Sequence, residues 1–189
     1  LGWNGTAVVG YSIDLHERYN GGLTFNNRTK NYNVFGSLSH YNNTGENQFN
    51  FDKRLNGYLL QTRTVDVWNN IGKDFRLGAD FFLNKTSTIG FLVNSTLIDR
   101  NTESNGHTPI ILESDNTIDQ ILVSQNFQEF DTQNSAFNLN YQFKGTKGTT
   151  LNVDADYGHY TNFGKGYQPN IYYDETEQTI ESSNANRTQ

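Results

Sequence analysis

The sequence predicts an all-β protein, an antiparallel up-and-down sheet of the kind that forms the wall of a transmembrane β-barrel. Three observations predict it. Apolar and polar residues alternate with a period of two in several segments. Short and long polar connections alternate between these segments. The chain is also rich in aromatic residues, with 13 Phe, 11 Tyr and 2 Trp, although only 34% of its 189 residues are hydrophobic. A wall that is apolar on one side only needs fewer apolar residues than a closed core.

Seven segments carry the alternation. It is sharpest in residues 74–84, 136–144 and 151–160, where one side of each segment is apolar and uncharged. It is weaker in residues 6–15, 21–28, 32–41 and 88–97, where Phe35, Tyr41 and Leu92 fall on the polar side. The segments approach the length of about 9–11 residues that a tilted transmembrane strand requires. We therefore expect about seven membrane strands.

The connections between these segments have two sizes. Short links fall at residues 27–31, 84–87 and 145–149, and long polar stretches cover residues 42–73, 99–134 and 161 onward. Alternate links of an up-and-down sheet lie at the same end, so we expect short periplasmic turns and long extracellular loops. Strand-like runs at residues 48–51, 58–68 and 118–130 predict strand extensions or hairpins within the long stretches. Pro109 and Pro169 also fall there, where we expect no ladder of backbone hydrogen bonds.

Composition excludes several classes of function. The chain has no cysteine, which rules out disulfides, zinc–thiolate sites and thiol catalysis. Its net charge of −6 is unfavourable for binding nucleic acid. No run approaches the roughly 20 apolar residues of a membrane helix, so a membrane crossing would be made by strands. We find no catalytic arrangement and no metal or cofactor motif, and we expect no enzyme.

We expect the chain to be a fragment or a processed segment, because it begins at Leu1 and contains no Met. We assign residues 1–189 to one partial barrel domain and expect no second domain. Seven strands cannot close a barrel of the bacterial type, in which strand counts are even.

Four stretches resemble a known family. They are residues 19–36 (YNGGLTFNNRTKNYNVFG), 78–94 (GADFFLNKTSTIGFLVN), 151–158 (LNVDADYG) and 167–170 (YQPN). In order and spacing they resemble the barrel of the Bacteroidetes outer-membrane β-barrel family of TonB-dependent receptors. The resemblance implies a 22-strand barrel in the bacterial outer membrane, filled by an N-terminal plug. It also implies a TonB box that contacts TonB. Neither the plug nor the TonB box is in this sequence.

The function that this resemblance implies is transport. A scarce nutrient, such as a siderophore or an oligosaccharide, would bind the extracellular side and pass when the plug rearranges. The expected partners are outer-membrane lipid, the plug, TonB and the nutrient, and a surface lipoprotein is left open. One alternative is a plugless barrel that serves structure, adhesion or secretion. Another is a soluble all-β carbohydrate-binding module, which predicts charged residues on the outer face.

Two groups of residues are candidate sites. Charges on the polar side could line the lumen or contact the plug, or simply face water: Asp74, Arg76, Asp80, Asp154 and Asp156. Aromatic residues of the long stretches could stack on a ligand or pack between neighbouring loops: Trp68, Phe127, Phe130, Tyr167, Tyr172 and Tyr173. An acidic run at Asp174, Glu175 and Glu177 could hold a cation, but it lacks the spacing of a calcium loop, and a solvated loop is favoured.

Overall fold

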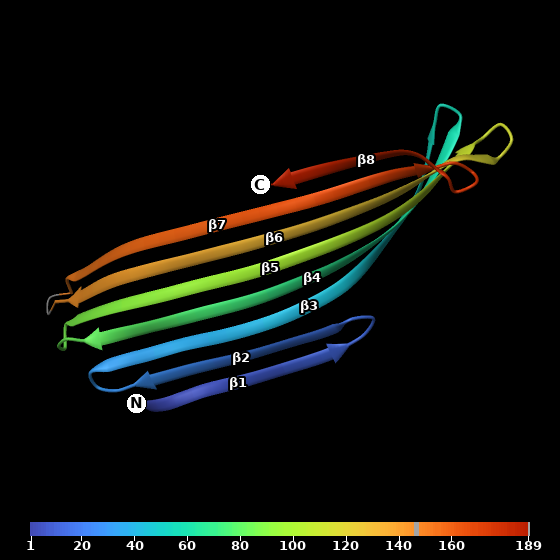
Figure 1. Ribbon diagram of the computed structural model, residues 1–189. Coiled ribbons are helices and arrows are strands. Elements are labelled where there is room, and N and C mark those ends of the chain that lie inside the picture. Colours follow the sequence, from blue (N-terminus) through green and yellow to red (C-terminus); the bar gives the residue numbers. More distant parts are fainter. Residues whose placement is uncertain (146–147, 189) are drawn as a thin grey trace. The chain divides into compact units, whose positions relative to one another are not determined.

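A computed structural model describes residues 1–145 and 148–188 of the chain as eight β-strands (Figure 1). The strands are β1 (Gly2–Ile13), β2 (Glu17–Arg28), β3 (Tyr32–Leu55), β4 (Tyr58–Phe82), β5 (Ser87–Leu112), β6 (Thr117–Lys144), β7 (Thr150–Tyr173) and β8 (Thr179–Thr188). They form one sheet in which each strand pairs with its neighbour in sequence. The predicted all-β, antiparallel up-and-down fold is confirmed. Within the described residues β1 and β8 have one neighbour each, so the sheet is open. No helix of the described chain is long and apolar enough to cross a membrane.

The long polar stretches of the sequence are hairpins. Residues 42–73 supply the end of β3 and the start of β4, and residues 99–134 do the same for β5 and β6. The strand extensions expected there are confirmed, and tight turns take the place of irregular loops. The region from residue 161 onward contains the end of β7 and the whole of β8. The residues that the structure describes therefore form eight strands, where the sequence pattern predicts seven.

The hairpins β3–β4 and β5–β6 end in turns whose residues explain their geometry. Asn56 and Gly57 have φ of 53° and 80°, the left-handed values that a two-residue hairpin of type I′ requires. The carboxylate of Asp115 accepts hydrogen bonds from the backbone N–H and the hydroxyl of Thr117. Such side-chain-to-backbone bonds stabilise short turns. These two connections can be short because each contains its own turn chemistry.

Contacts divide the chain into two compact units. The first unit comprises Leu1–Asn43, Ile71–Asp99 and Asp131–Asn162, and the second comprises Thr44–Asn70, Arg100–Phe130 and Phe163–Gln189. The second unit begins and ends within a few residues of the predicted long stretches. The loss of clear alternation in the sequence therefore marks a structural boundary.

The first unit is a single layer with two different faces. In β1, β2 and β3, Ala7 lies opposite Leu23, which lies opposite Leu38, and directly opposed residues point to the same side. Between β4 and β5 the rings of Phe81 and Phe91 share that side. Only one hydrophobic side chain of the described residues, Ala79 at 3% exposure, is buried. The unit therefore has no closed core of its own.

The expectation that the two prolines lie outside the ladder is wrong. Pro109 lies in β5, and Pro169 lies in β7 opposite Asn184 of β8. A proline removes one backbone donor. Because each residue of an antiparallel strand directs its N–H toward only one neighbouring strand, the other side of the ladder keeps its hydrogen bonds.

Candidate functional site

The first unit carries a broad apolar face that nothing in the described chain covers. We define this apolar face by its exposed large side chains: Val9, Tyr11, Leu23, Leu38, Phe75, Phe81, Phe91, Phe137, Leu139, Leu151, Val153 and Tyr157. Leu139 is 54% exposed and Tyr157 is 63% exposed. An exposed apolar patch of this extent is rare on a water-soluble monomer and marks a surface that meets a partner or a membrane.

Charged residues appear on the apolar face only at its margins. Along β4 the face runs from Phe75 through Leu77 and Ala79 to Phe81 without a charge, and the uncharged Leu83 follows the end of the strand. The charged strand residues of this face in the described chain are Glu17, Lys73, Asp99 and Asp131. Three of these lie within a few residues of the boundary between the units. The uncharged band therefore has a defined edge.

The opposite side of the first unit, the polar face, holds the charges predicted for the lumen. Asp74 accepts hydrogen bonds from the hydroxyls of Ser39, at 3.1 Å, and Thr96, at 2.8 Å. Asp80 accepts one from the Asn33 amide at 3.2 Å, and Asp156 accepts one from the Asn138 amide at 2.8 Å. These contacts tie β3 to β5 through β4, and β6 to β7.

A row of hydrogen-bonded Asn side chains, which we call the amide row, crosses this face. The sequence pattern does not reveal it. Asn26 donates to Asn33, which donates to Asp80, and Asn140 donates to Asn138, which donates to Asp156. Gly90 lies between the two halves. A Cβ atom there would be 2.7 Å from Oδ1 of Asn140 and 2.8 Å from Oδ1 of Asp80. The glycine therefore leaves room for polar side chains of both neighbouring strands.

Two aromatic residues on the polar face lie over glycines of the next strand. The Phe35 ring occupies the space that a Cβ of Gly78 would need, and the Tyr41 ring does the same at Gly72. The Arg76 guanidinium lies 5.8 Å from the centroid of Phe35, within the range of a cation–π contact. In the sequence, Phe35 and Tyr41 interrupt the alternation because they fall on the polar side. The ring–glycine pairs explain this placement, since each ring fills the space beside a glycine. Asp154, the last of the predicted charges, lies on the same face and is exposed.

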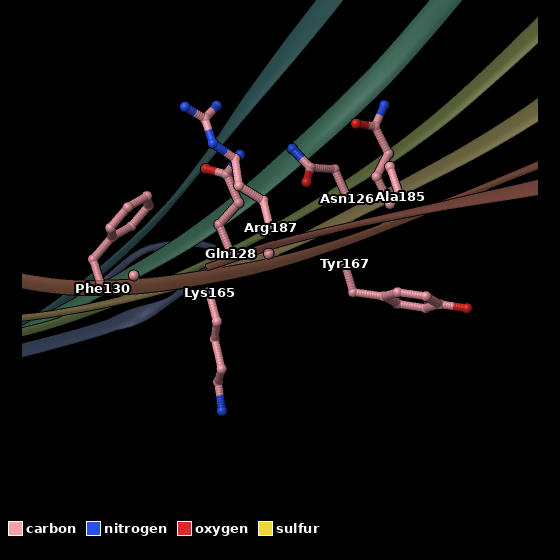
Figure 2. A pocket seen from close by; sticks show the side chains of 10 residues that line it. Asn126, Gln128, Phe130, Lys165, Tyr167, Ala185 and Arg187 are labelled. Carbon is pink, nitrogen blue, oxygen red and sulfur yellow. The ribbon is translucent and has the colours of Figure 1, made fainter. Parts of the chain in front are cut away.

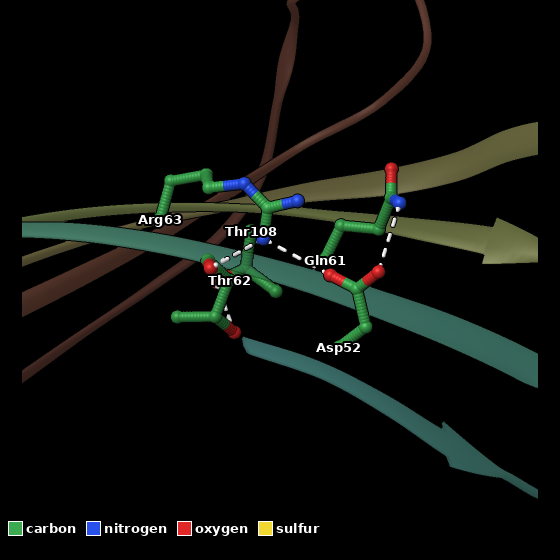
Figure 3. A network of polar contacts seen from close by, with 5 residues as sticks. All are labelled: Asp52, Gln61, Thr62, Arg63 and Thr108. Carbon is green, nitrogen blue, oxygen red and sulfur yellow. Dashed lines mark hydrogen bonds and ion pairs between the residues drawn. The ribbon is translucent and has the colours of Figure 1, made fainter. Parts of the chain in front are cut away.

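In the second unit, the side that carries the odd-numbered residues of β4 to β7 is charged. Figure 3 shows Asp52 of β3, which accepts hydrogen bonds from Arg63 at 3.0 Å and from Gln61 at 3.4 Å. The hydrogen bond from Arg63 is the main cause that lowers the pKa of Asp52 below its ordinary value. Lys165 pairs with Glu129 on this side at 2.6 Å. This side therefore differs chemically from the apolar face of the first unit.

The other side of the second unit contains a groove above β7, which we call the β7 groove. Its cavity volume is about 190 Å³. It is lined by Asn126, Gln128 and Phe130 of β6, by Gly164, Lys165, Gly166, Tyr167 and Gln168 of β7, and by Ala185 and Arg187 of β8. Figure 2 shows the Lys165 and Tyr167 side chains pointing away from those of Asn126, Gln128, Phe130 and Arg187. Only the backbone of these two residues can therefore face the groove.

The predicted aromatic ligand residues do not form one cluster. Phe127 and Tyr167 stack on the charged side, with centroids 6.4 Å apart and an angle of 16° between the rings. Phe130 lies on the groove side, and a Cβ atom on Gly164 would be 2.6 Å from its ring. Trp68 similarly covers Gly45. Tyr172 and Tyr173 lie at an irregularity in the pairing of β7 with β8.

The acidic run lies in the turn between β7 and β8. The Asp174 carboxylate accepts hydrogen bonds from the Thr176 hydroxyl at 2.7 Å and from the Gln178 N–H at 2.9 Å. These bonds, the one from the Thr176 hydroxyl first, lower the pKa of Asp174. Asp174 thus stabilises the turn through these hydrogen bonds. In the part of the chain that the structure describes, no three His, Asp or Glu side chains are placed to hold a metal ion.

The sequence pattern does not predict two features, the amide row and the residues that line the β7 groove. Both depend on strand register, which brings residues of different strands to one level. The Gly-x-Gly spacing of Gly164 and Gly166 is the one local signal for the groove, because two such glycines leave one side of a strand bare. No protein-family model and no curated protein matches the chain.

Proposed function

We propose that this chain is part of the wall of a transmembrane β-barrel in the bacterial outer membrane. The barrel would belong to a TonB-dependent receptor that takes up a scarce nutrient. The observation that carries the membrane proposal is the apolar face, an exposed and uncharged band on one side of a single-layered sheet. Lipid chains are the natural cover for such a band, and water in a lumen suits the hydrogen-bonded polar face behind it.

The dimensions of the band agree with this proposal. The uncharged positions extend from Phe75 in β4 to Leu83, which follows the last residue of that strand, close to the 9–11 residues that a tilted strand needs to span a bilayer. In the second unit the odd-numbered side carries Arg63, Glu129 and Lys165, which belong in water. A soluble carbohydrate-binding module would need a second layer of protein over the apolar face.

The assignment to TonB-dependent receptors is supported by the resemblance of residues 19–36, 78–94, 151–158 and 167–170. The charged polar face suits contact with a plug, because Asp74, Asp80 and Asp156 present carboxylate oxygens. Deletion of TonB should leave the protein in the outer membrane and abolish the growth advantage that its gene gives on a limiting nutrient. An advantage that persists without TonB would favour the plugless barrel.

Cysteine labelling tests the membrane proposal directly, because the chain has no cysteine of its own. We would introduce Leu77→Cys and Leu139→Cys on the apolar face, and Ser37→Cys and Gly158→Cys on the polar face, in a cysteine-free version of the full protein. In outer membranes, a water-soluble maleimide should label the second pair and spare the first pair, because the thiolate that attacks maleimide does not form in hydrocarbon. The first pair should react with the same reagent after unfolding in denaturant. Labelling of Leu77→Cys and Leu139→Cys by the water-soluble reagent before unfolding would overturn the proposal.

A further inference from the structure

We propose that the β7 groove binds a carboxylate-bearing sugar unit of an oligosaccharide. This inference gives a ligand class to the uptake function and rests on that function. It comes from three properties of the groove: a bare backbone floor, walls of amide and aromatic side chains, and one cationic side chain.

The floor is made by glycine. A Cβ atom on Gly166 would meet only the backbone O of Phe127 at 3.5 Å and Cγ of Gln128 at 3.9 Å, which are ordinary contact distances. The space above Gly166 is therefore open. Gly164 is buried beneath the Phe130 ring, which closes the groove on that side. A ligand can thus approach the β7 backbone at Gly166 and lie against the edge of Phe130.

The walls suit a ring that carries hydroxyl groups. Asn126 and Gln128 of β6 and Gln168 of β7 line the groove. A carboxamide both donates and accepts hydrogen bonds, as a hydroxyl does, so amides match a polyhydroxylated ligand. Phe130 offers apolar surface for the C–H bonds of a sugar ring. The cavity of about 190 Å³ is smaller than the roughly 300–1,000 Å³ of drug-sized sites, so one ring would fill it.

The charge of the groove selects an anion. Figure 2 shows Arg187 on the groove side of the sheet and Lys165 on the opposite side. Among the described residues that line the groove there is no Asp or Glu. A guanidinium binds a carboxylate through two parallel hydrogen bonds, which gives geometric selectivity as well as affinity. The groove therefore fits a uronate better than a neutral sugar.

Binding experiments with the full protein in detergent test this inference. The probes are an oligomer of galacturonate and an oligomer of glucose of equal length, titrated calorimetrically. We expect the acidic oligomer to bind the wild-type protein more tightly. Arg187→Gln should weaken its binding about tenfold or more, because a charge-assisted pair is lost. Gly166→Val should abolish binding by filling the open floor.

Lys165→Gln is the matched control, because it removes the same charge from the adjoining strand on the opposite side. It should leave the affinity for the acidic oligomer unchanged. An equal loss with Lys165→Gln and Arg187→Gln would reveal general electrostatic attraction and overturn the site. Equal binding of the two oligomers would overturn the selectivity for carboxylate.

The two proposals fail in different ways. If neither oligomer binds while the protein still inserts into the outer membrane as a heat-modifiable barrel, the ligand assignment is overturned and the barrel stands. If the protein is absent from the outer membrane and soluble without detergent, the proposed function itself is overturned. Binding of the acidic oligomer that is sensitive to Arg187→Gln and insensitive to Lys165→Gln supports the site.

Discussion

The aromatic ring of Tyr41 in β3 lies across Gly72 in β4, so that any side chain at Gly72 would overlap the ring. On the other side of the sheet, Nδ1–H of His40 donates to the carbonyl oxygen of the same glycine at 3.1 Å. Consecutive residues of β3 thus hold one residue of β4 from both faces. The arrangement requires glycine at this position.

Substitution of Gly72 should therefore destabilise the sheet. Gly72→Val displaces the Tyr41 ring, and overpacking of this kind costs about 1–3 kcal/mol. The shift in gel mobility of the folded protein on heating gives the midpoint of unfolding, which should fall. Gly158→Val is the control, since a Cβ atom at Gly158 meets nothing within 4 Å. Equal midpoints for the two variants would contradict the steric role of Tyr41.

The turn between β3 and β4 should depend on Gly57 more than on Asn56. Gly57 has φ of 80°, and a side chain in the left-handed region costs about 1–2 kcal/mol. Gly57→Ala should therefore raise the rate of amide hydrogen exchange at the tip of the hairpin. Asn56→Gly should change it little, because Asn and Gly both tolerate the φ of 53° found there. Unchanged exchange in Gly57→Ala would show that the turn differs from this geometry.

Acid should loosen the turn between β7 and β8. Hydrogen bonds from Thr176 and Gln178 lower the folded pKa of Asp174 below its ordinary value of 3.8. A lowered carboxyl pKa contributes stability above the unfolded value, and this contribution is lost as the pH falls through the folded value. Proteolysis at residues 174–178 should accordingly become faster as the pH drops below about 4.

Asp174→Asn provides the comparison for this pH dependence. The amide oxygen of Asn keeps an acceptor for the Thr176 and Gln178 donors but does not titrate in this range. The variant should lose the acid-induced rise in cleavage, measured with an acid-stable protease. The same rise in wild type and Asp174→Asn would assign the effect to another group.

A charge on the apolar face should block assembly in the membrane. Tyr157 is 63% exposed on the apolar face, and Gly158 follows it in β7 with its Cβ direction open on the polar face. Arginine facing lipid near the bilayer centre costs about 2–4 kcal/mol. Tyr157→Arg should lower the fraction of folded protein in the outer membrane, and Gly158→Arg should not. If Gly158→Arg lowered the folded fraction and Tyr157→Arg did not, the face assigned to lipid and the face assigned to water would have to be exchanged.

The sequence pattern predicts the first unit well because the two faces of that unit differ in polarity. Alternation is strong where one side is apolar, as in Phe75, Leu77, Ala79, Phe81 and Leu83. In the second unit both sides of the strands carry polar residues as well as apolar ones, and the pattern fades. Ile121, Leu122 and Val123 are consecutive in β6, and β8 contains a single large apolar residue, Ile180. Such strands carry no periodic signal for burial.

One signal for the β3–β4 hairpin was nevertheless local. Asn56-Gly57 lies between the strand-like runs 48–51 and 58–68, and this dipeptide is a strong indicator of a two-residue turn. The candidate site is harder to predict. Phe130 and Gly164 lie 34 positions apart, and only the register between β6 and β7 brings them together. The same holds for Trp68 and Gly45.

The ring–glycine pairs bear on how the strands find their correct alignment. A slip of one residue would move Asp74 and Asp80 to the side occupied by Leu77 and Phe81. Such a slip is unfavourable because it places charged side chains on the apolar face. A slip of two residues keeps every side chain on its own face, so hydrophobicity does not oppose it. The fit of Tyr41 to Gly72 opposes a slip of two residues, because the slip would place the Tyr41 ring over Asn70 or Asp74, the neighbours of Gly72 on that face. Shape complementarity thus excludes the misaligned sheets that polarity would tolerate.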